Sequence, residues 1–231
     1  MSNYQQIRDY LDFLSQTYNL HICVKDFIGF IPINKNLDSV LSPYLAHTNP
    51  YCMFIKQDRN RYFKCLSMIR PMYNKCLVND EGFYGMCHAG VYEYVIPVKL
   101  NGDLLGSINV GCFPGKNKTA HFLVKRLFRD SDTSLRKKAI EMFDKHILPT
   151  SIQPEKFIPE MLLLSEYLGQ TYVNFQSSHV GRSIAALPRE SLEDIIVPHA
   201  IEYINQNYQS KISVRQIANF CHCCESYINH T

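Results

Sequence analysis

The sequence predicts a mixed α/β fold of the α+β type, in which helices surround an antiparallel sheet and further helices follow. Alternating apolar residues on both sides of Asn101–Gly102 form the pattern of a β-hairpin. Apolar residues spaced three and four apart indicate amphipathic helices at both ends of the chain. With 46% hydrophobic and 19% charged residues, the composition is that of a folded globular protein.

The first third of the chain predicts a helix, a strand and a second helix. Residues 2–18 place Leu11 and Leu14 on one helical face, and residues 20–33 alternate as a strand does. Residues 37–46 predict a short helix that is capped near Asp38 or Ser39. Residues 52–70 predict one long or broken helix carrying Cys52 and Cys65, which we expect Pro71 to end because proline interrupts helices. Another short helix is expected after it.

The hairpin over residues 84–115 is the part of the chain around which the rest is organised. Gly106, Ser107, Asn109 and Gly111 are small or polar and lie in an otherwise apolar second strand. Glycine in a strand often marks a close approach of backbone to a ligand. We therefore expect an open strand face against which a small molecule can lie.

The second half predicts helices joined by turns. Residues 116–147 predict two helices broken at 130–133, and their many cations are interpreted as a solvated face rather than a phosphate site. Residues 147–159 contain three prolines and predict a loop. Residues 157–175 predict an amphipathic helix that packs either on its own domain or on a second subunit. Its apolar stripe is Met161, Leu164, Leu168, Tyr172 and Phe175.

The hairpin also carries a family resemblance. The stretch CHAGVYEYVIPVKLNGDLLGSINVG, which begins at Cys87, resembles the PocR sensory domain pattern of C-H-x-G, a strand ending in Pro, a turn and G-x-I-x-x-G. The resemblance implies a PAS/GAF-like sensor that binds small hydrocarbon-derived metabolites such as propanediol. Such sensors often precede an AraC-type DNA-binding region.

Residues 189–231 independently resemble the first half of an AraC-type double helix-turn-helix. The I-x-Y-I-x-x-x-Y pattern of an opening helix begins at Ile201, and an I-S-V-x-x-I-A stretch begins at Ile212. Ser213 is a suitable N-cap for the helix that follows. The resemblance implies DNA contacts from Arg215, Ser226, Tyr227 and Asn229. The chain stops at Thr231, inside the first recognition helix, so we expect DNA binding to be weak or absent.

The predicted organisation therefore has three parts. Residues 1–150 form a PocR-like sensor, residues 151–188 a signalling helix and linker, and residues 189–231 a partial helix-turn-helix. We expect a cytoplasmic protein, because the start lacks a signal peptide and no apolar run is long enough to span a bilayer. The AraC resemblance implies a homodimer, since AraC-type readers often work as pairs, and we expect it to pair through residues 157–176. The net charge of +3 only mildly favours nucleic-acid contact.

The candidate ligand-binding residues combine sulfur, imidazole, phenol and amide groups. Aromatic walls supply contact area, and hydroxyl and amide groups orient a small ligand. Buried structural thiols are an alternative interpretation, and a zinc or iron site formed by the three cysteines and the histidine is another. Adjacent Cys87 and His88 are expected on opposite faces of a strand. The candidate residues are Cys52, Cys65, Tyr84, Cys87, His88, Tyr92 and Asn109.

The sequence favours a ligand-responsive transcription regulator with no cofactor. A phosphate-binding glycine loop, a nucleophile elbow and an HExxH motif are all missing from the sequence, so an enzyme is not expected. Residues 221–224 read Cys-His-Cys-Cys and are interpreted as turn residues, with a metal site as the alternative. The competing functions are a metal or redox sensor and a dimerisation partner that does not bind DNA.

Overall fold

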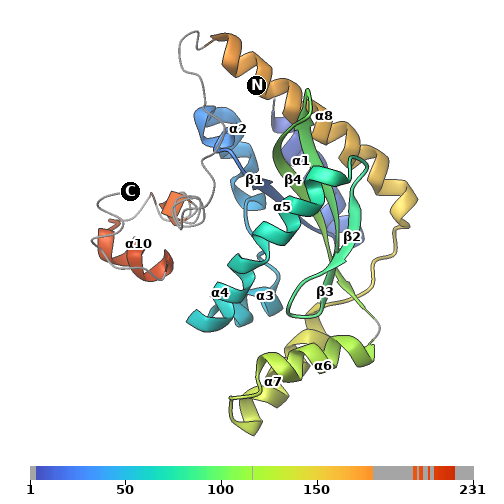
Figure 1. Cartoon of the computed structure of the whole chain (residues 1–231), viewed down its shortest axis with the longest axis vertical. Coiled ribbons are helices and arrows are strands. Elements are labelled where there is room, and N and C mark those ends of the chain that lie inside the picture. The colour runs from blue at the N-terminus through green and yellow to red at the C-terminus, as the bar shows by residue number, and fades with distance from the viewer. Residues whose placement is uncertain are drawn as a thin grey trace.

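The sheet at the centre of the chain is antiparallel throughout. The computed structural model describes residues 4–115, 117–178, 200–201, 203–204, 208 and 211–221. Four strands lie in the order β1-β4-β3-β2. Their bounds are β1 His21–Asp26, β2 Phe83–Met86, β3 Val91–Leu100 and β4 Asp103–Pro114. The predicted mixed α/β class with an antiparallel sheet is confirmed (Figure 1).

Two tight turns join the last three strands. Asn101 and Gly102 have φ values of 51° and 91°, as the predicted hairpin turn requires. The other turn spans Cys87 to Gly90, where the N–H of Cys87 donates to the Val91 carbonyl at 2.8 Å. The expectation that Cys87 and His88 alternate within a strand is therefore wrong. They lie in a turn, which Gly90 closes with a φ of 81°.

The N-terminal helices follow the prediction with different ends. Helix α1 spans Gln5–Tyr18, and strand β1 stops at Asp26 because its carboxylate accepts N–H bonds from the chain that turns after it. The short helices η1 Ile31–Ile33 and η2 Ser42–Tyr44 flank α2 Lys35–Leu41. Asn34, and not Asp38 or Ser39, caps α2, since its Oδ1 accepts from the N–H groups of Asn36 and Leu37.

The region predicted as one long or broken helix followed by another short helix forms three helices. They are α3 Pro50–Lys56, α4 Arg59–Ser67 and α5 Ile69–Val78. One break falls at Asp58, which accepts the Arg61 N–H at 3.0 Å and so caps α4. The predicted second break falls at Met68, three residues before Pro71, which itself lies in the first turn of α5, where a helix requires no N–H donor.

The C-terminal half contains the predicted pair of helices and the long helix. Helices α6 Asn117–Leu127 and α7 Thr133–His146 flank the predicted break, with Asp132 capping α7. They lie beyond one end of the sheet (Figure 1). Helix α8 spans Pro154–Ser178 and α10 spans Val214–Cys221. None of the helices that the structure describes combines the length and apolar character required to cross a bilayer.

Ser213 caps α10 as predicted, in a reciprocal arrangement. Its hydroxyl oxygen accepts the Gln216 N–H at 3.3 Å, and the Gln216 side chain accepts the Ser213 N–H at 2.9 Å. Arg215 is exposed on the first turn. The other predicted DNA contacts, Ser226, Tyr227 and Asn229, lie outside the described residues, as do His222 and Cys223–Cys224.

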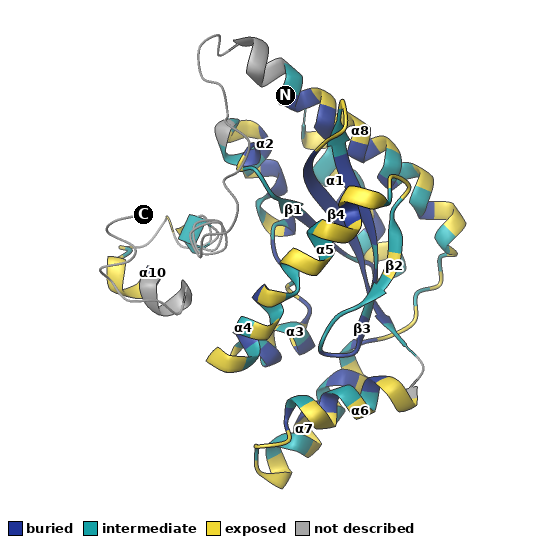
Figure 2. Ribbon diagram, viewed as in Figure 1, coloured by how far each residue is buried: buried dark blue, intermediate teal, exposed yellow. Residues whose placement is uncertain are grey.

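Two layers of helices cover the two faces of the sheet. Helices α1, α2 and α8 pack on one face and share its largest apolar core, while α3, α4 and α5 cover the other (Figure 1). Strands β3 and β4 are the most buried (Figure 2). The apolar stripe of α8 packs on its own domain. For the described side chains this favours the first interpretation over packing on a second subunit. Those side chains are Met161, Leu164, Leu168 and Tyr172.

The glycines of β4 do not leave an open face. A Cβ atom on Gly106 would collide with the carbonyl oxygen of Lys25 on β1. A Cβ atom on Gly111 would lie 2.8 Å from the Cγ of Glu93. The expectation of a bare strand face is therefore wrong at these two positions, where glycine permits close packing of the protein's own atoms.

Candidate ligand-binding site

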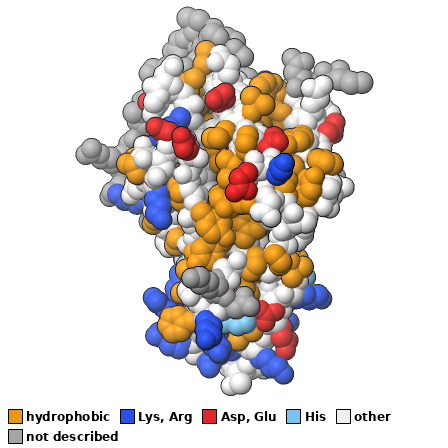
Figure 3. Space-filling view, turned by 90° about the vertical axis from the view of Figure 1, so that its right-hand side faces the viewer, with side chains coloured by type: hydrophobic (Ala, Val, Ile, Leu, Met, Phe, Trp, Pro, Cys, Tyr) orange, Lys and Arg blue, Asp and Glu red, His pale blue; other side chains and the backbone are white. Residues whose placement is uncertain are grey.

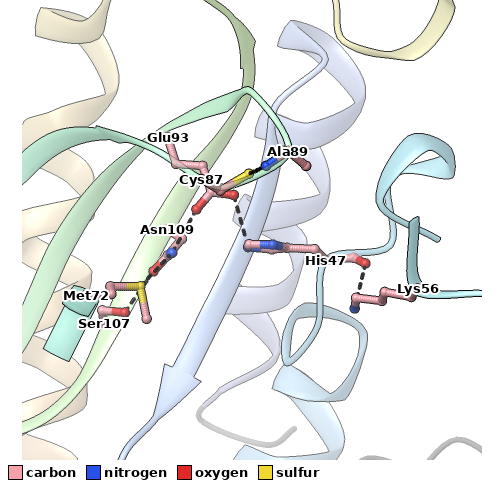
Figure 4. A network of polar contacts seen from close by, with 8 residues as sticks. All are labelled: His47, Lys56, Met72, Cys87, Ala89, Glu93, Ser107 and Asn109. Atoms are coloured by element: carbon pink, nitrogen blue, oxygen red, sulfur yellow. Dashed lines mark hydrogen bonds and ion pairs between the residues drawn. The ribbon is translucent and has the colours of Figure 1, made fainter. Parts of the chain in front are cut away.

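A chain of buried polar side chains lies on the face of the sheet that α3, α4 and α5 cover. The Ser107 hydroxyl donates to Asn109 Oδ1 at 2.7 Å, and Asn109 Nδ2 donates to Glu93 Oε2 at 2.9 Å (Figure 4). The same amide nitrogen lies 3.2 Å from the Met72 sulfur of α5. Glu93, Ser107 and Asn109 are 9%, 0% and 2% exposed, so these groups are shielded from bulk solvent and bond to one another.

Strand alternation places these three side chains together. In β3 and β4, Val95 pairs with Asn109 and Pro97 pairs with Ser107. Successive side chains of a strand point to opposite faces, so Glu93 shares the face of Asn109 while Tyr94 points toward α8. The polar face is therefore built from odd-numbered positions between apolar ones.

His47 connects the network to the outside of the protein. Its Nε2 lies 3.3 Å from Glu93 Oε1, and Lys56 donates to its main-chain oxygen at 3.3 Å (Figure 4). Burial raises the pKa of Glu93, which the Asn109 hydrogen bond partly offsets. Burial also lowers the pKa of His47 well below its usual value, and nearby Lys25 adds to this. Both shifts disfavour charge separation across the contact.

A surface hollow of about 190 Å³ reaches this end of the network. His21 and His47 both line it, together with Asn19 and Thr48. Behind it, buried Asn49 fixes three elements. Its Nδ2 lies 3.1 Å from His21 Nε2 and donates to the His146 carbonyl at 3.0 Å, and its Oδ1 caps α3. His47 is thus the one residue of the network that lines this hollow, while Glu93 lies behind it.

The predicted cysteines gather beside the polar chain. Cys87 lies next to Glu93 (Figure 4), and Cys65 Sγ lies 3.1 Å from His88 Nε2. Burial raises the pKa of Cys65 to about 11 and also raises that of Cys87. Burial, with a smaller effect from Lys64, lowers the pKa of His88 to about 4. Thiols with raised pKa values are protonated at neutral pH, so they are not activated nucleophiles.

The zinc or iron alternative finds no site in the part of the chain that the structure describes. There, no group of three or more His, Cys, Asp or Glu side chains is arranged to hold a metal ion. Cys65 and His88 are close, but a structural zinc ion takes four such ligands.

The predicted ligand set is split between the two faces of the sheet. Asn109, Cys87 and the residues around them lie on the polar face. Tyr84 and Tyr92 lie on the opposite face, where their rings stack at 5.0 Å between centroids. Tyr84 is 46% exposed. Both tyrosines are thus separated by the sheet from the polar network.

Sequence reasoning missed four members of the site. Glu93 had a usable signal, because it is the single acid in an apolar strand between two tyrosines. Ser107 was noted only as a small residue on the strand. His47 and Met72 come from regions with no distinguishing pattern, and only the packing of α5 and of the segment before α3 brings them to the sheet.

The fold and site together define a class of protein. An antiparallel sheet covered by helices, with a buried polar network on one face and a hollow lined by His47 at its edge, is consistent with a small-molecule sensory domain. The sequence model described as the sensory domain found in PocR matches residues 2–150. The chain belongs to this family. The comparisons with curated proteins and with solved structures gave no match.

Proposed function

We propose that the chain is a transcription regulator that senses a small, uncharged metabolite at the Glu93–Asn109–Ser107 network. The observation that carries the proposal is a hydrogen-bonded polar chain buried in a domain of the PocR sensory family. Carboxyl, amide and hydroxyl groups match the hydroxyl groups of a diol or the oxygen of an aldehyde. Burial disfavours charge on Glu93 and His47, so the site favours neutral groups. Burying a charged ligand there would therefore be costly.

The proposed signal passes through β3 to α8. Glu93 is on one face of β3, and the neighbouring Tyr94 packs on the other face against Phe157 of α8, with ring centroids 5.6 Å apart. Ser165 of α8 also donates a hydrogen bond to the Pro97 carbonyl at 2.6 Å. A ligand shifts such an arrangement only by binding its two states unequally. Movement of β3 would change the position of α8.

The output is proposed to be DNA binding by a homodimer. The outer face of α8 exposes Leu163 and Tyr167, which are 67% and 42% exposed, and a second copy is the proposed partner for them. The AraC-like residues 189–231 supply the DNA contacts, with Arg215 on the exposed first turn of α10. Helix α8 directly precedes this region in the chain.

Thermal-shift and calorimetric titration of the full chain test the ligand class. We expect short vicinal diols or aldehydes to raise the melting temperature, and carboxylates of the same length to have no effect. Ser107→Ala removes a hydroxyl group from the network and should weaken the response. Tyr84→Ala is the matched control, because it lies on the opposite face and should leave the response unchanged.

The outcome also decides where the ligand binds. Equal responses from the wild type and Ser107→Ala, with a loss in Tyr84→Ala, would move the site to the tyrosine face. A response to carboxylates alone would contradict an uncharged ligand. Analytical ultracentrifugation with and without the active compound tests the homodimer separately.

A further inference from the structure

The outward face of α6 carries cations near both of its ends. Lys118, Phe122, Lys125 and Arg126 are exposed, and Arg129 follows in the turn after the helix. At 3.6 residues per turn these positions fall within one stripe of the helix surface. None of the five is acidic. The cations of residues 116–147 are therefore not evenly distributed over a solvated surface, because α6 carries a stripe of one sign.

The cations of this stripe are not neutralised by their surroundings. Lys118, Lys125 and Arg126 make no ion pair or hydrogen bond with any residue that the structure describes. Arg129 pairs with Asp130 at 3.3 Å, but both side chains are more than three-quarters exposed, so the pair contributes little.

The neighbouring helix α7 differs in this respect. Lys137 pairs with Glu141 at 4.0 Å. The Asp144 Oδ1 atom of α7 lies 2.7 Å from the Nε2 atom of His121, which belongs to α6. The acidic residues of the α6–α7 pair thus lie on α7 or in the loop before it. In Figure 3, Lys and Arg side chains surround the lower part of the molecule, whereas acidic and apolar side chains are more frequent in the upper part.

The geometry of α6 favours a rigid polyanion over a lipid surface. A helix that binds lipid inserts its apolar face, but Ala120 and Val124 of α6, and Phe128 just after it, are 0% exposed in the protein core. Only Phe122, at 61% exposure, remains for insertion. From Lys118 to Arg129 the stripe extends roughly 16 Å, which spans several phosphates of one DNA strand.

We propose that the exposed face of α6 is a contact surface for the sugar–phosphate backbone of duplex DNA. The sensory domain then adds sequence-independent affinity to whatever the C-terminal region reads. The inference relies on the proposed function only for the choice of DNA as the polyanion, and it does not depend on the metabolite site.

Salt-dependent binding of the full chain to a fluorescent random-sequence duplex tests the surface. Each phosphate that a cation of the protein neutralises adds about 0.9 to the magnitude of the slope of log K against log salt, so removing one such contact lowers that magnitude by about 0.9. The double variant Lys125→Ala/Arg126→Ala should therefore lower the slope by about 2. The charge-matched control Lys137→Ala/Lys145→Ala on α7 removes the same net charge from the mixed face. It should change the slope by clearly less.

The other outcomes are equally decisive. Equal slope changes for the two double variants would show a general charge effect and overturn the α6 surface. Binding to phosphatidylserine vesicles that Lys125→Ala/Arg126→Ala abolishes, without binding to DNA, would assign the surface to lipid and also overturn the proposal. Arg215→Ala separates the two regions, because loss of the C-terminal contacts leaves the α6 contribution to the slope intact. The thermal response to diols reports on the sensor independently.

Discussion

The two faces of one sheet differ in the chemistry that they bury. On the α8 face, Tyr94, Phe113 and Phe157 pack ring against ring with centroids about 6 Å apart. On the other face, Glu93 and Asn109 are hydrogen-bonded in the interior. Apolar burial supplies most of the free energy of folding, whereas a satisfied buried network mainly specifies one arrangement. The comparison separates a face that stabilises the domain from a face suited to recognition.

The largest expected effect comes from the apolar face. Phe157→Ala removes a ring that is 0% exposed and should lower the free energy of unfolding by about 3–5 kcal/mol. Ser107→Ala, on the polar face, should cost about 1–3 kcal/mol, because it leaves the buried Asn109 Oδ1 without its donor. Urea unfolding followed by circular dichroism measures both. Similar losses for the two variants would erase the proposed division between the faces.

The second prediction concerns the pH dependence of the polar side. Because burial lowers the pKa of His88 from 6.5 to about 4, the unfolded chain binds this proton at higher pH than the folded chain does. The resulting stability is complete above pH 6.5 and is lost as the pH falls toward 4. It amounts to about 3 kcal/mol.

The variant His88→Gln tests this origin, since glutamine does not titrate. The difference in the free energy of unfolding between pH 7 and pH 4 should be smaller in the variant than in the wild type. His21 and His47 also have lowered pKa values and titrate in both proteins, so they cancel in the comparison. An unchanged pH profile would show that His88 is accessible to protons in the folded state.

A third prediction concerns the close approach of β1 to β4. Gly106→Ala places a Cβ atom against the Lys25 carbonyl oxygen, and overpacking of this kind costs about 1–3 kcal/mol. Gly85→Ala is the control, because its Cβ would meet only the flexible Phe83 side chain at 3.3 Å. Thermal unfolding of the two variants should separate them, with Gly106→Ala melting first. The reverse order would restore the expectation of an open strand face.

The smallest expected effect on stability is on the outer face of α8. Leu163→Ser replaces an exposed side chain and should change the free energy of unfolding of the monomer by less than about 0.5 kcal/mol. The same variant should shift the sedimentation profile toward monomer, because it removes apolar area from the proposed contact. A profile identical to that of the wild type would place the dimer contact elsewhere.

Sequence reasoning reached the parts of the fold that local chemistry decides. Asn101–Gly102 specifies its turn, the spacing of Leu11 and Leu14 identifies α1, and the break near Asp132 follows from its capping role. The predicted helix boundaries were wrong where a side-chain cap sets the start of a helix. Asp58 and Asn34 cap helices at positions that periodicity does not reveal.

The site was less predictable because it depends on contacts between distant segments. Asn109, Cys87 and His88 were identified from the motif of their hairpin. Met72, which contacts Asn109, and His47, which contacts Glu93, arrive through packing that no local pattern encodes. Tyr84 and Tyr92 were assigned to the site by residue type alone, and strand parity places them on the other face.

The hydrogen bond from Ser165 to the Pro97 carbonyl restricts how α8 can move. At this position β2 no longer pairs with β3, since their pairing ends at Phe83 and Val95. One turn further along, a Cβ atom on Gly169 would lie 2.8 Å from the Lys99 carbonyl oxygen, so helix and strand backbones nearly touch. Sliding of α8 along its axis would break this bond and bring a residue with a Cβ atom against the Lys99 carbonyl. Two contacts one helical turn apart therefore hold α8 to β3, so a shift of the strand carries the helix with it.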